Sequence, residues 1–310
     1  MTLRPAGFID LPAHRGKGGF DHAAVHAASG RLYVAHTAND ALDVVDTKAN
    51  RLLRSIPDLK GVAGVLVSDE RDLVFTSNRD EDTVSIFPEG EEAAASKVKV
   101  GVHPNGLAFA PHRGLLLAAN IGDSSAPGST TISFVNVPAR TLLATLPIPG
   151  RPRWCLVDQK TRAFYVAIRD PPQIVVIDAP RADRIARALP VPAAGPHGLD
   201  LDPVRGRLFC ACDAARLVVL NRTTGQVLAD RPLSGPPDVV FYNPILQHLY
   251  VAVGDPGVID VFDTMRLERI ETCPTEKGAH TIALDATTGR VYAFLPESHR
   301  AAVFEDAPGG

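Results

Sequence analysis

The fold of this chain is decided by residues 31–46, which read RLYVAHTANDALDVVD. Two short apolar runs, Leu32–Ala35 and Leu42–Val45, flank a polar turn. Runs of this length, rich in β-branched and aromatic residues and bounded by Asn and Asp, are typical of β-strands. The segment therefore predicts two antiparallel strands joined by a tight connection.

The same pattern recurs along the chain, with the first apolar runs 41 to 48 residues apart. A repeat of this period indicates a repeat architecture. A further strand before each pair and a closing strand after it, as at Leu52–Ile56 and Leu142–Leu146, give four strands per unit. Seven four-stranded units in ring order predict an all-β, seven-bladed β-propeller. The seven first runs begin at Leu32, Leu73, Leu116, Phe164, Leu208, Leu249 and Val291.

The two ends of the chain predict how the ring closes. The last unit ends in Ala302–Asp306 with no fourth strand after it, whereas the chain starts with the unpaired apolar segment Ala6–Pro12. We expect this segment to complete the seventh blade and so to remove the exposed sheet edges. Residues 1–310 are thus predicted to form one propeller domain.

Composition excludes several classes of protein. The 310 residues are 45% hydrophobic and 22% charged, which is typical of a globular chain and excludes intrinsic disorder. A net charge of −3 gives no basic face for nucleic acid or for an anionic membrane. The chain shows neither a signal peptide nor a transmembrane run, and its four cysteines lack a CxxC pair. We expect a cytoplasmic protein without nucleic-acid or membrane partners.

Polar residues gather where the innermost strands are expected to begin. These strands line the central channel of a propeller, and counting back 11 residues from each second strand marks equivalent positions at its mouth. The positions are Asp21, Val62, Asn105, Arg153, His197, Asp238 and His280. Blades five, six, seven and one contribute His197, Asp238, His280 and Asp21 as a contiguous arc, which could hold a divalent metal ion or supply catalytic acids and bases. The alternative is plain solvation of a water-filled channel.

Further side chains are predicted to contact a small-molecule substrate at this mouth. Arg153 could anchor a carboxylate or a phosphate, or could form a salt bridge with an acidic residue across the channel. Trp154 could form an apolar wall, with packing between blades as its alternative role. The loop 121–130 is rich in Gly, Ser and Pro and could cover the mouth as a mobile flap, or be only a disordered surface loop. The other predicted contacts are Asn105, His22, His103, His36 and Asn120.

The repeats also resemble a known family. Tyr33-Val-Ala-His-Thr-Ala-Asn39 followed by Leu42-Asp-Val-Val-Asp46 resembles the YVTN repeat of the YncE-like seven-bladed β-propellers. The turns His103-Pro-Asn-Gly106 and Gly195-Pro-His-Gly198 resemble those of NHL propellers and of the streptogramin-lyase and gluconolactonase-like propellers. The resemblance implies the propeller fold. It implies no single function, because such propellers include lyases, lactonases and binding scaffolds.

Two functions are consistent with these observations. The first is a metal-assisted lyase or lactone hydrolase, in which His197, Asp238, His280 and Asp21 hold a divalent ion or move a proton while the ion polarises a carbonyl group. The second is a non-catalytic propeller that binds a protein or a small ligand on the face that carries the arc. The sequence contains no nucleophile elbow, phosphate loop or HExxH motif.

Overall fold

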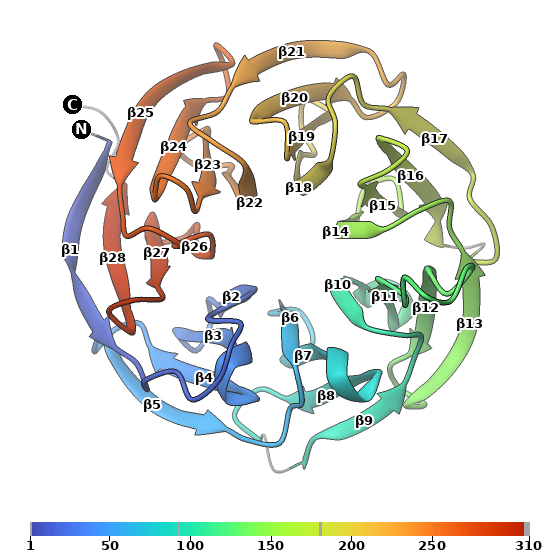
Figure 1. Ribbon diagram of the computed structural model, residues 1–310, viewed down its shortest axis with the longest axis horizontal. Helices are drawn as coiled ribbons and strands as arrows, with labels where there is room; N and C mark the ends of the chain where they lie inside the picture. Colours follow the sequence, from blue (N-terminus) through green and yellow to red (C-terminus); the bar gives the residue numbers. More distant parts are fainter. Residues whose placement is uncertain (1, 92–93, 180–181, 307–310) are drawn as a thin grey trace.

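The computed structural model describes residues 2–91, 94–179 and 182–306 and has the shape of a ring (Figure 1). These residues form seven four-stranded antiparallel sheets arranged as blades around a central channel. The predicted fold class, an all-β seven-bladed propeller, is therefore confirmed. The described residues include no helix that is both long and apolar enough to cross a membrane.

Each blade begins with its innermost strand at the channel and proceeds outward. Blades one and two comprise β2 (Ala23–His26), β3 (Arg31–His36), β4 (Ala41–Asp46), β5 (Arg51–Ile56), β6 (Val62–Ser68), β7 (Leu73–Asn78), β8 (Thr83–Pro88) and β9 (Ser96–Lys99). Blades three and four comprise β10 (Pro104–Ala110), β11 (Leu115–Asn120), β12 (Thr131–Asn136), β13 (Thr141–Pro147), β14 (Pro152–Asp158), β15 (Ala163–Ile168), β16 (Gln173–Asp178) and β17 (Arg187–Pro190).

The remaining blades follow the same plan. Blades five and six comprise β18 (Pro196–Asp202), β19 (Arg207–Cys212), β20 (Arg216–Asn221), β21 (Val227–Pro232), β22 (Pro237–Asn243), β23 (His248–Val253), β24 (Val258–Asp263) and β25 (Glu268–Pro274). Blade seven comprises β26 (Ile282–Asp285), β27 (Arg290–Leu295), β28 (Arg300–Asp306) and β1 (Leu3–Asp10). Short 3₁₀ turns in the described chain are η1 (Thr37–Asn39), η2 (Arg79–Glu81) and η4 (Pro111–Arg113).

Closure of the ring is as predicted. The N-terminal strand β1 pairs antiparallel with β28, from Leu3 opposite Asp306 to Asp10 opposite Arg300. Leu3 and Ile9 are fully buried, so one face of β1 belongs to the core. The outermost strand of the last blade thus comes from the opposite end of the chain, which joins the two termini in one sheet (Figure 1).

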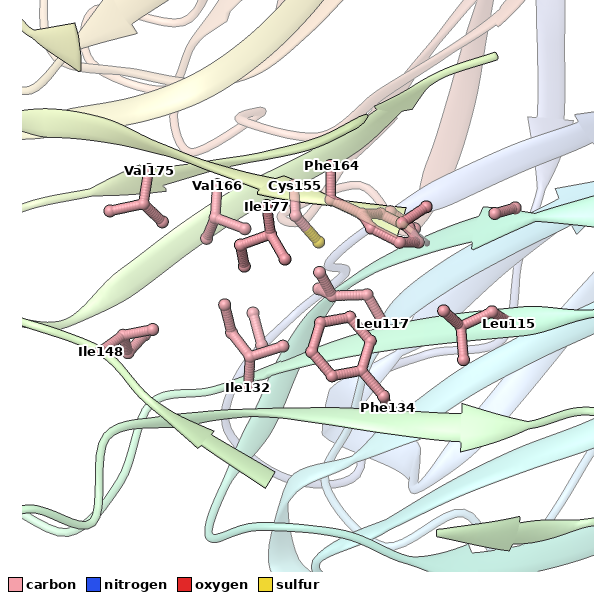
Figure 2. Close-up of a cluster of buried hydrophobic side chains, with 14 of the residues drawn as sticks. Leu115, Leu117, Ile132, Phe134, Ile148, Cys155, Phe164, Val166, Val175 and Ile177 are labelled. Carbon is pink, nitrogen blue, oxygen red and sulfur yellow. The ribbon is translucent and has the colours of Figure 1, made fainter. Parts of the chain in front are cut away.

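The hydrophobic cores lie between neighbouring blades. Figure 2 shows one of them, in which Leu117 and Phe134 of blade three face Cys155, Phe164 and Ile177 of blade four. Strands buried on both faces read as nearly continuous apolar runs. This is why the second and third strands were visible in the sequence. All four cysteines are buried as free thiols, and burial raises the pKa of the Cys155 thiol.

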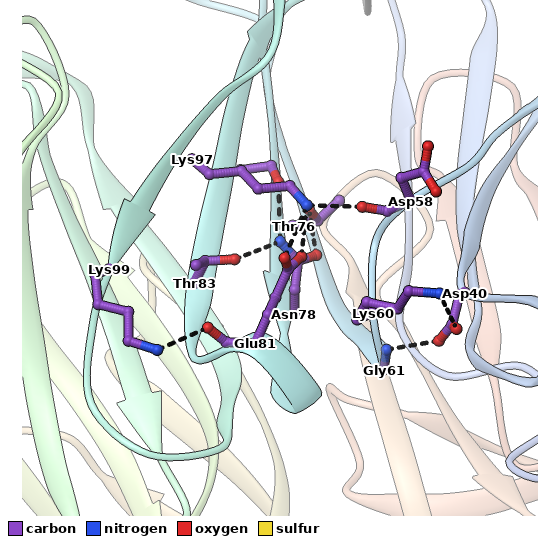
Figure 3. Close-up of polar contacts among 11 residues, drawn as sticks. Asp40, Asp58, Lys60, Gly61, Thr76, Asn78, Glu81, Thr83, Lys97 and Lys99 are labelled. Carbon is purple, nitrogen blue, oxygen red and sulfur yellow. Dashed lines mark hydrogen bonds and ion pairs between the residues drawn. The ribbon is translucent and has the colours of Figure 1, made fainter.

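Polar side chains tie the strand ends of blade two together. In Figure 3, the Lys97 ammonium donates to the Glu81 carboxylate at 2.7 Å and to the carbonyl oxygen of Asp58 at 2.7 Å. The amide of Asn78, at the end of β7, donates to the hydroxyls of Thr83 and Ser85 at 3.0 and 2.9 Å. The contacts of Asn78 hold the ends of the second and third strands of blade two together, and those of Lys97 hold the fourth strand to η2 and to the segment that precedes β6.

Candidate functional site

The strand register defines which residues surround the channel mouth. Leu107 pairs with Ala118 and Val65 pairs with Thr76, so Ala63 occupies in blade two the position of Asn105 in blade three. Counting back 11 residues gave Val62 instead of Ala63 for blade two. The count started from Leu73, which is the first residue of β7 and therefore corresponds to Arg31, the first residue of β3, and not to Leu32. The ring of equivalent positions is Asp21, Ala63, Asn105, Arg153, His197, Asp238 and His280.

The mouth of the channel is a polar cavity of about 400 Å³. Of the predicted site residues, it contains five members of the ring together with His22 and His103, and it lacks His280. Its lining consists of Asp21, His22, Arg79, His103, Asn105, Ile121, Arg151, Arg153, His197 and Asp238. The prediction of one site formed from several blades thus corresponds to one real cavity.

His197 is clamped between two carboxylates. Its Nδ1 lies 2.8 Å from Asp213 Oδ1, and its Nε2 lies 3.0 Å from Asp238 Oδ1. Burial by itself would lower the pKa of His197, but the charge of Asp238 and the two hydrogen bonds outweigh it and raise that pKa to about 9. The imidazole is therefore a cation at neutral pH, and its charge keeps the pKa of Asp238 below the usual range despite burial.

His22 lines the same cavity, but its imidazole is neutral at neutral pH, whereas that of His197 is charged. Its side chain is buried, and its Nε2 lies 3.4 Å from Asp21 Oδ1. Burial lowers the pKa of His22, and the charge of Asp21 only partly offsets this effect. One cavity thus holds a protonated and a neutral imidazole at neutral pH. Two titratable groups whose pKa values are pushed apart are a common arrangement for acid and base chemistry.

Trp154 crosses the channel beneath the cavity. Its indole stacks on His22 of blade one with ring centroids 4.3 Å apart, and it meets Phe241 of blade six edge-on at 6.1 Å. At the position of Trp154, blades three and five carry glycines, Gly106 and Gly198, where a side chain has no room. A Cβ atom would lie 2.6 Å from the Arg153 carbonyl oxygen at Gly106 and 2.3 Å from the Asp238 carbonyl oxygen at Gly198. Trp154 thus packs against the imidazole of His22, which lines the cavity, and between the blades, but it is not itself among the lining residues and does not form the predicted wall.

The arginines on the other side of the cavity are only partly paired. Arg79 Nη2 contacts Asp21 Oδ2 at 2.9 Å and donates to Asn105 Oδ1 at 2.5 Å. Within the residues that the structure describes, the guanidinium groups of Arg151 and Arg153 make no ion pair and no hydrogen bond, and Arg153 Nε is buried without a partner. Burial, together with the nearby charge of Arg151, lowers the pKa of Arg153. The cavity thus carries uncompensated positive charge.

The predicted arc is only partly assembled. Asp238 links His197 to His280, whose Nε2 lies 3.9 Å from Asp238 Oδ2, but His280 is half-exposed outside the cavity lining. His280 Nδ1 donates to the carbonyl oxygen of Gly278 at 2.7 Å. Asp21 is engaged by Arg79 instead of meeting the rest of the arc.

This arrangement does not fit the predicted divalent metal ion. Within the described part of the chain, no group of three or more His, Cys, Asp or Glu side chains is placed to hold a metal. Both ring nitrogens of His197 face carboxylates, so neither directs a lone pair toward an ion. We therefore derive no chemistry through a metal at this site.

Of three further predicted contacts, one lines the cavity and two do not. His103 does line the cavity, and its Nδ1 donates to the carbonyl oxygen of Gly122 in the loop 121–130 at 3.1 Å. His36 and Asn120 do not line it. His36 is fully buried and bonds to Asp43 and His14 at 2.7 and 2.8 Å, whereas the Asn120 amide donates to Thr131 and Ser133 at 3.0 Å each. Like Asn78, both residues fix the ends of strands.

Several residues of the site were not predicted as contacts. Arg79 and Asp213 each follow the end of a second strand, β7 and β19, and Arg151 lies just before β14. Asp213 also accepts a hydrogen bond from Arg169 Nε at 2.9 Å, which anchors the carboxylate that clamps His197. Their places in the sequence could have revealed them, because charged residues directly after second strands lie on the same face of the propeller as the ring of equivalent positions.

The clamp on His197 predicts a pH dependence. The raised pKa of His197 stabilises the folded protein below about pH 6.5, and this contribution is lost as the pH rises through about 9. We expect the free energy of unfolding to fall by about 3 kcal/mol over this interval. NMR titration of the imidazole carbon-bound protons, with His197→Gln to assign the signal, measures the pKa directly. A His197 signal that titrates near pH 6.5 would contradict the clamp.

Comparisons with known proteins establish the fold and no more. No protein-family model matches the chain, and no curated protein matches it. Among solved structures it is similar to a chain of hydrazine synthase from Kuenenia stuttgartiensis, with a TM-score of 0.82, 14% sequence identity and coverage of 97% of each chain. At this identity the similarity shows the shared propeller fold alone.

Proposed function

We propose that the channel mouth binds a small anionic molecule and catalyses a proton transfer on it, as a lyase or a lactone hydrolase. The observation that carries the proposal is the pair Arg151 and Arg153, which line the cavity without an ion pair or hydrogen bond within the described residues. Guanidinium groups bind carboxylates and phosphates through two parallel hydrogen bonds. An anionic substrate would supply the missing partner.

The two histidines supply the chemistry in this proposal. The neutral His22 accepts the proton. In an elimination, it takes the proton from the carbon next to the carboxylate, the C–H electrons form the double bond, and the leaving group departs with its own electron pair. In lactone hydrolysis, His22 takes a proton from water, the water oxygen bonds to the carbonyl carbon, and the ring oxygen leaves and receives the proton from His22. The cationic His197 stabilises the negative charge that develops.

The only tryptophan of the chain provides the test. Because Trp154 stacks on His22 beneath the cavity, a bound ligand is expected to change its fluorescence. We would titrate small carboxylates, lactones and phosphate esters and follow products by NMR. Arg153→Gln is expected to weaken binding at least tenfold, or by about 1.4 kcal/mol. Arg51→Gln, an exposed change of the same charge on the outer strand β5, is the matched control.

The outcomes separate the alternatives. Binding that depends on Arg153, together with product formation, supports the proposal. Binding without turnover of any compound favours a non-catalytic propeller that binds a small ligand or a protein. A fluorescence response that is equal in the Arg153→Gln and Arg51→Gln variants contradicts anion binding at the mouth. Metal content of the purified protein and of the His197→Ala and His280→Ala variants tests the predicted metal ion separately.

We also propose that the chain belongs to the YVTN-repeat group of propellers. Support comes from the repeated Tyr-Val-Ala segments, whose tyrosines Tyr33, Tyr165 and Tyr250 occupy the same buried position in the second strands β3, β15 and β23. A profile built from propellers of that group would have to align these three tyrosines in register.

A further inference from the structure

Contacts between blades follow a rule on the face opposite the channel mouth. In four blades, the residue at or just after the end of the third strand bonds to the second strand of the preceding blade. Glu89 accepts from Arg31 at 2.8 Å, and Asp306 lies 2.7 Å from His248 Nδ1. The carbonyl oxygens of Thr47 and Thr264 accept from Arg290 and Arg207 at 3.0 and 2.6 Å. Arg222 likewise reaches Asp158 in the first strand of blade four at 2.5 Å.

Among the described residues, two interfaces lack this link: the one between blades three and four, where the buried Ala179 follows β16, and the one between blades two and three. The corresponding residue of blade three is the buried Val137, which follows β12. At this interface there is a cavity of about 340 Å³, which is lined by Arg71, His112, Arg113 and Arg140 from the turns on this face. Among the residues that the structure describes, no carboxylate lines it. This cavity, which we call the arginine pocket, therefore collects positive charge, whereas in the links described above the arginines meet carboxylates or carbonyl oxygens.

Arg140 is the most exceptional of these residues. Its Nη1 atom is buried without a hydrogen-bond partner, and the described residues offer its guanidinium no ion pair. Burial lowers the pKa of Arg140, and no acidic neighbour opposes this effect. A cationic donor atom that is buried without a partner is destabilising. An arrangement of this kind is expected where a ligand supplies the partner.

The other two arginines have room for the same ligand. Arg71 Nη2 donates to the carbonyl oxygen of Pro111 at 2.9 Å, and its Nε lies 3.8 Å from the exposed Glu70 carboxylate. The remaining N–H groups of this guanidinium are available to a ligand. Arg113 is exposed and forms no ion pair with the described residues. Three guanidinium groups thus surround one cavity whose floor is apolar, formed by Phe109 and Val137.

We propose that the arginine pocket is a binding site for a phosphate-type oxyanion, either inorganic phosphate or the phosphate group of an ester. Three positive charges with no acid among the lining residues match a dianion better than a single carboxylate. Planar guanidinium forks fit phosphate oxygens in pairs. The site lies between the turns at the far ends of the inner strands, so it is separate from the channel mouth and does not depend on the function proposed there.

Calorimetry with inorganic phosphate tests the site. The titration uses the Arg153→Gln protein, which removes one of the two unpaired arginines of the channel mouth, at constant ionic strength. We expect saturable binding that Arg140→Gln weakens at least tenfold. The matched control is Arg162→Gln, which removes the same charge from an exposed turn of blade four with nearly the same backbone φ, 58° against 56°. Phenyl phosphate in place of phosphate distinguishes an ester from the free ion.

Thermal unfolding distinguishes a loss of phosphate binding from a folding defect. Without phosphate, Arg140→Gln is expected to melt at or above the wild-type temperature, because it removes a charged group whose Nη1 atom is buried without a partner. Phosphate should raise the melting temperature of the wild type and of Arg162→Gln but not that of Arg140→Gln. Arg113→Gln, an exposed change, should weaken binding several-fold while folding normally. Absence of saturable binding in the Arg153→Gln protein, or equal losses in Arg140→Gln and Arg162→Gln, would overturn the proposal.

Discussion

Replacing Ile9 by Ser is expected to lower the free energy of unfolding by about 4 kcal/mol. Ile9 is fully buried on β1 and packs in one cluster with Phe294, Ala301 and Val303 of blade seven. The substitution leaves a cavity and places a hydroxyl in an apolar site. It also loosens the strand that closes the ring and covers the edge of β28. Urea unfolding, followed by circular dichroism, measures the change.

The neighbouring residue supplies the control for this prediction. Phe8 lies on the other face of β1 and is 60% exposed. Phe8→Ser therefore removes a larger apolar side chain from the same strand but should cost less than about 1 kcal/mol. If both variants lost stability equally, the loss would come from the strand as a whole and not from the buried face through which β1 closes the ring.

His22→Phe is expected to lower the turnover of a substrate found by the fluorescence and NMR screen by about 100-fold to 10,000-fold. Phenylalanine keeps the stacking surface for Trp154 but removes both ring nitrogens, so the protein should fold normally. In the wild type, kcat/KM should rise as His22 loses its proton below pH 6.5. It should fall again as His197 loses its proton near pH 9. The variant should lose the rise at low pH.

His280→Phe distinguishes this assignment from the predicted metal-bound arc. His280 lies outside the cavity lining and touches the site only through Asp238, at 3.9 Å. Its replacement should therefore reduce kcat/KM far less than His22→Phe does. A large loss in His280→Phe combined with full activity in His22→Phe would show that the arc, and not His22, carries the reaction.

Much of the fold could be predicted from the sequence because the features that define it are local. Each blade repeats the alternation of short apolar runs and polar turns, as in Leu32–Ala35 and Leu42–Val45, and strands buried on both faces leave such runs in any sequence. The unpaired segment Ala6–Pro12 indicated the closure that the pairing of β1 with β28 shows. Counting from the repeats located Asn105, Arg153, His197 and Asp238 at one cavity. The same count failed at Val62, because Leu73 is one residue out of step with the other copies.

The sequence by itself therefore determined the propeller, its closure and the position of its polar mouth, since each follows from periodicity along the chain. Only the tertiary structure decided what the polar residues do. The clamp on His197 needs Asp238 from the next blade, and His22 meets Trp154 across the channel. Protonation of these histidines and the unpaired state of Arg153 depend on burial and on charges from several blades. Those distances exist only once the ring has closed, and no local pattern encodes them.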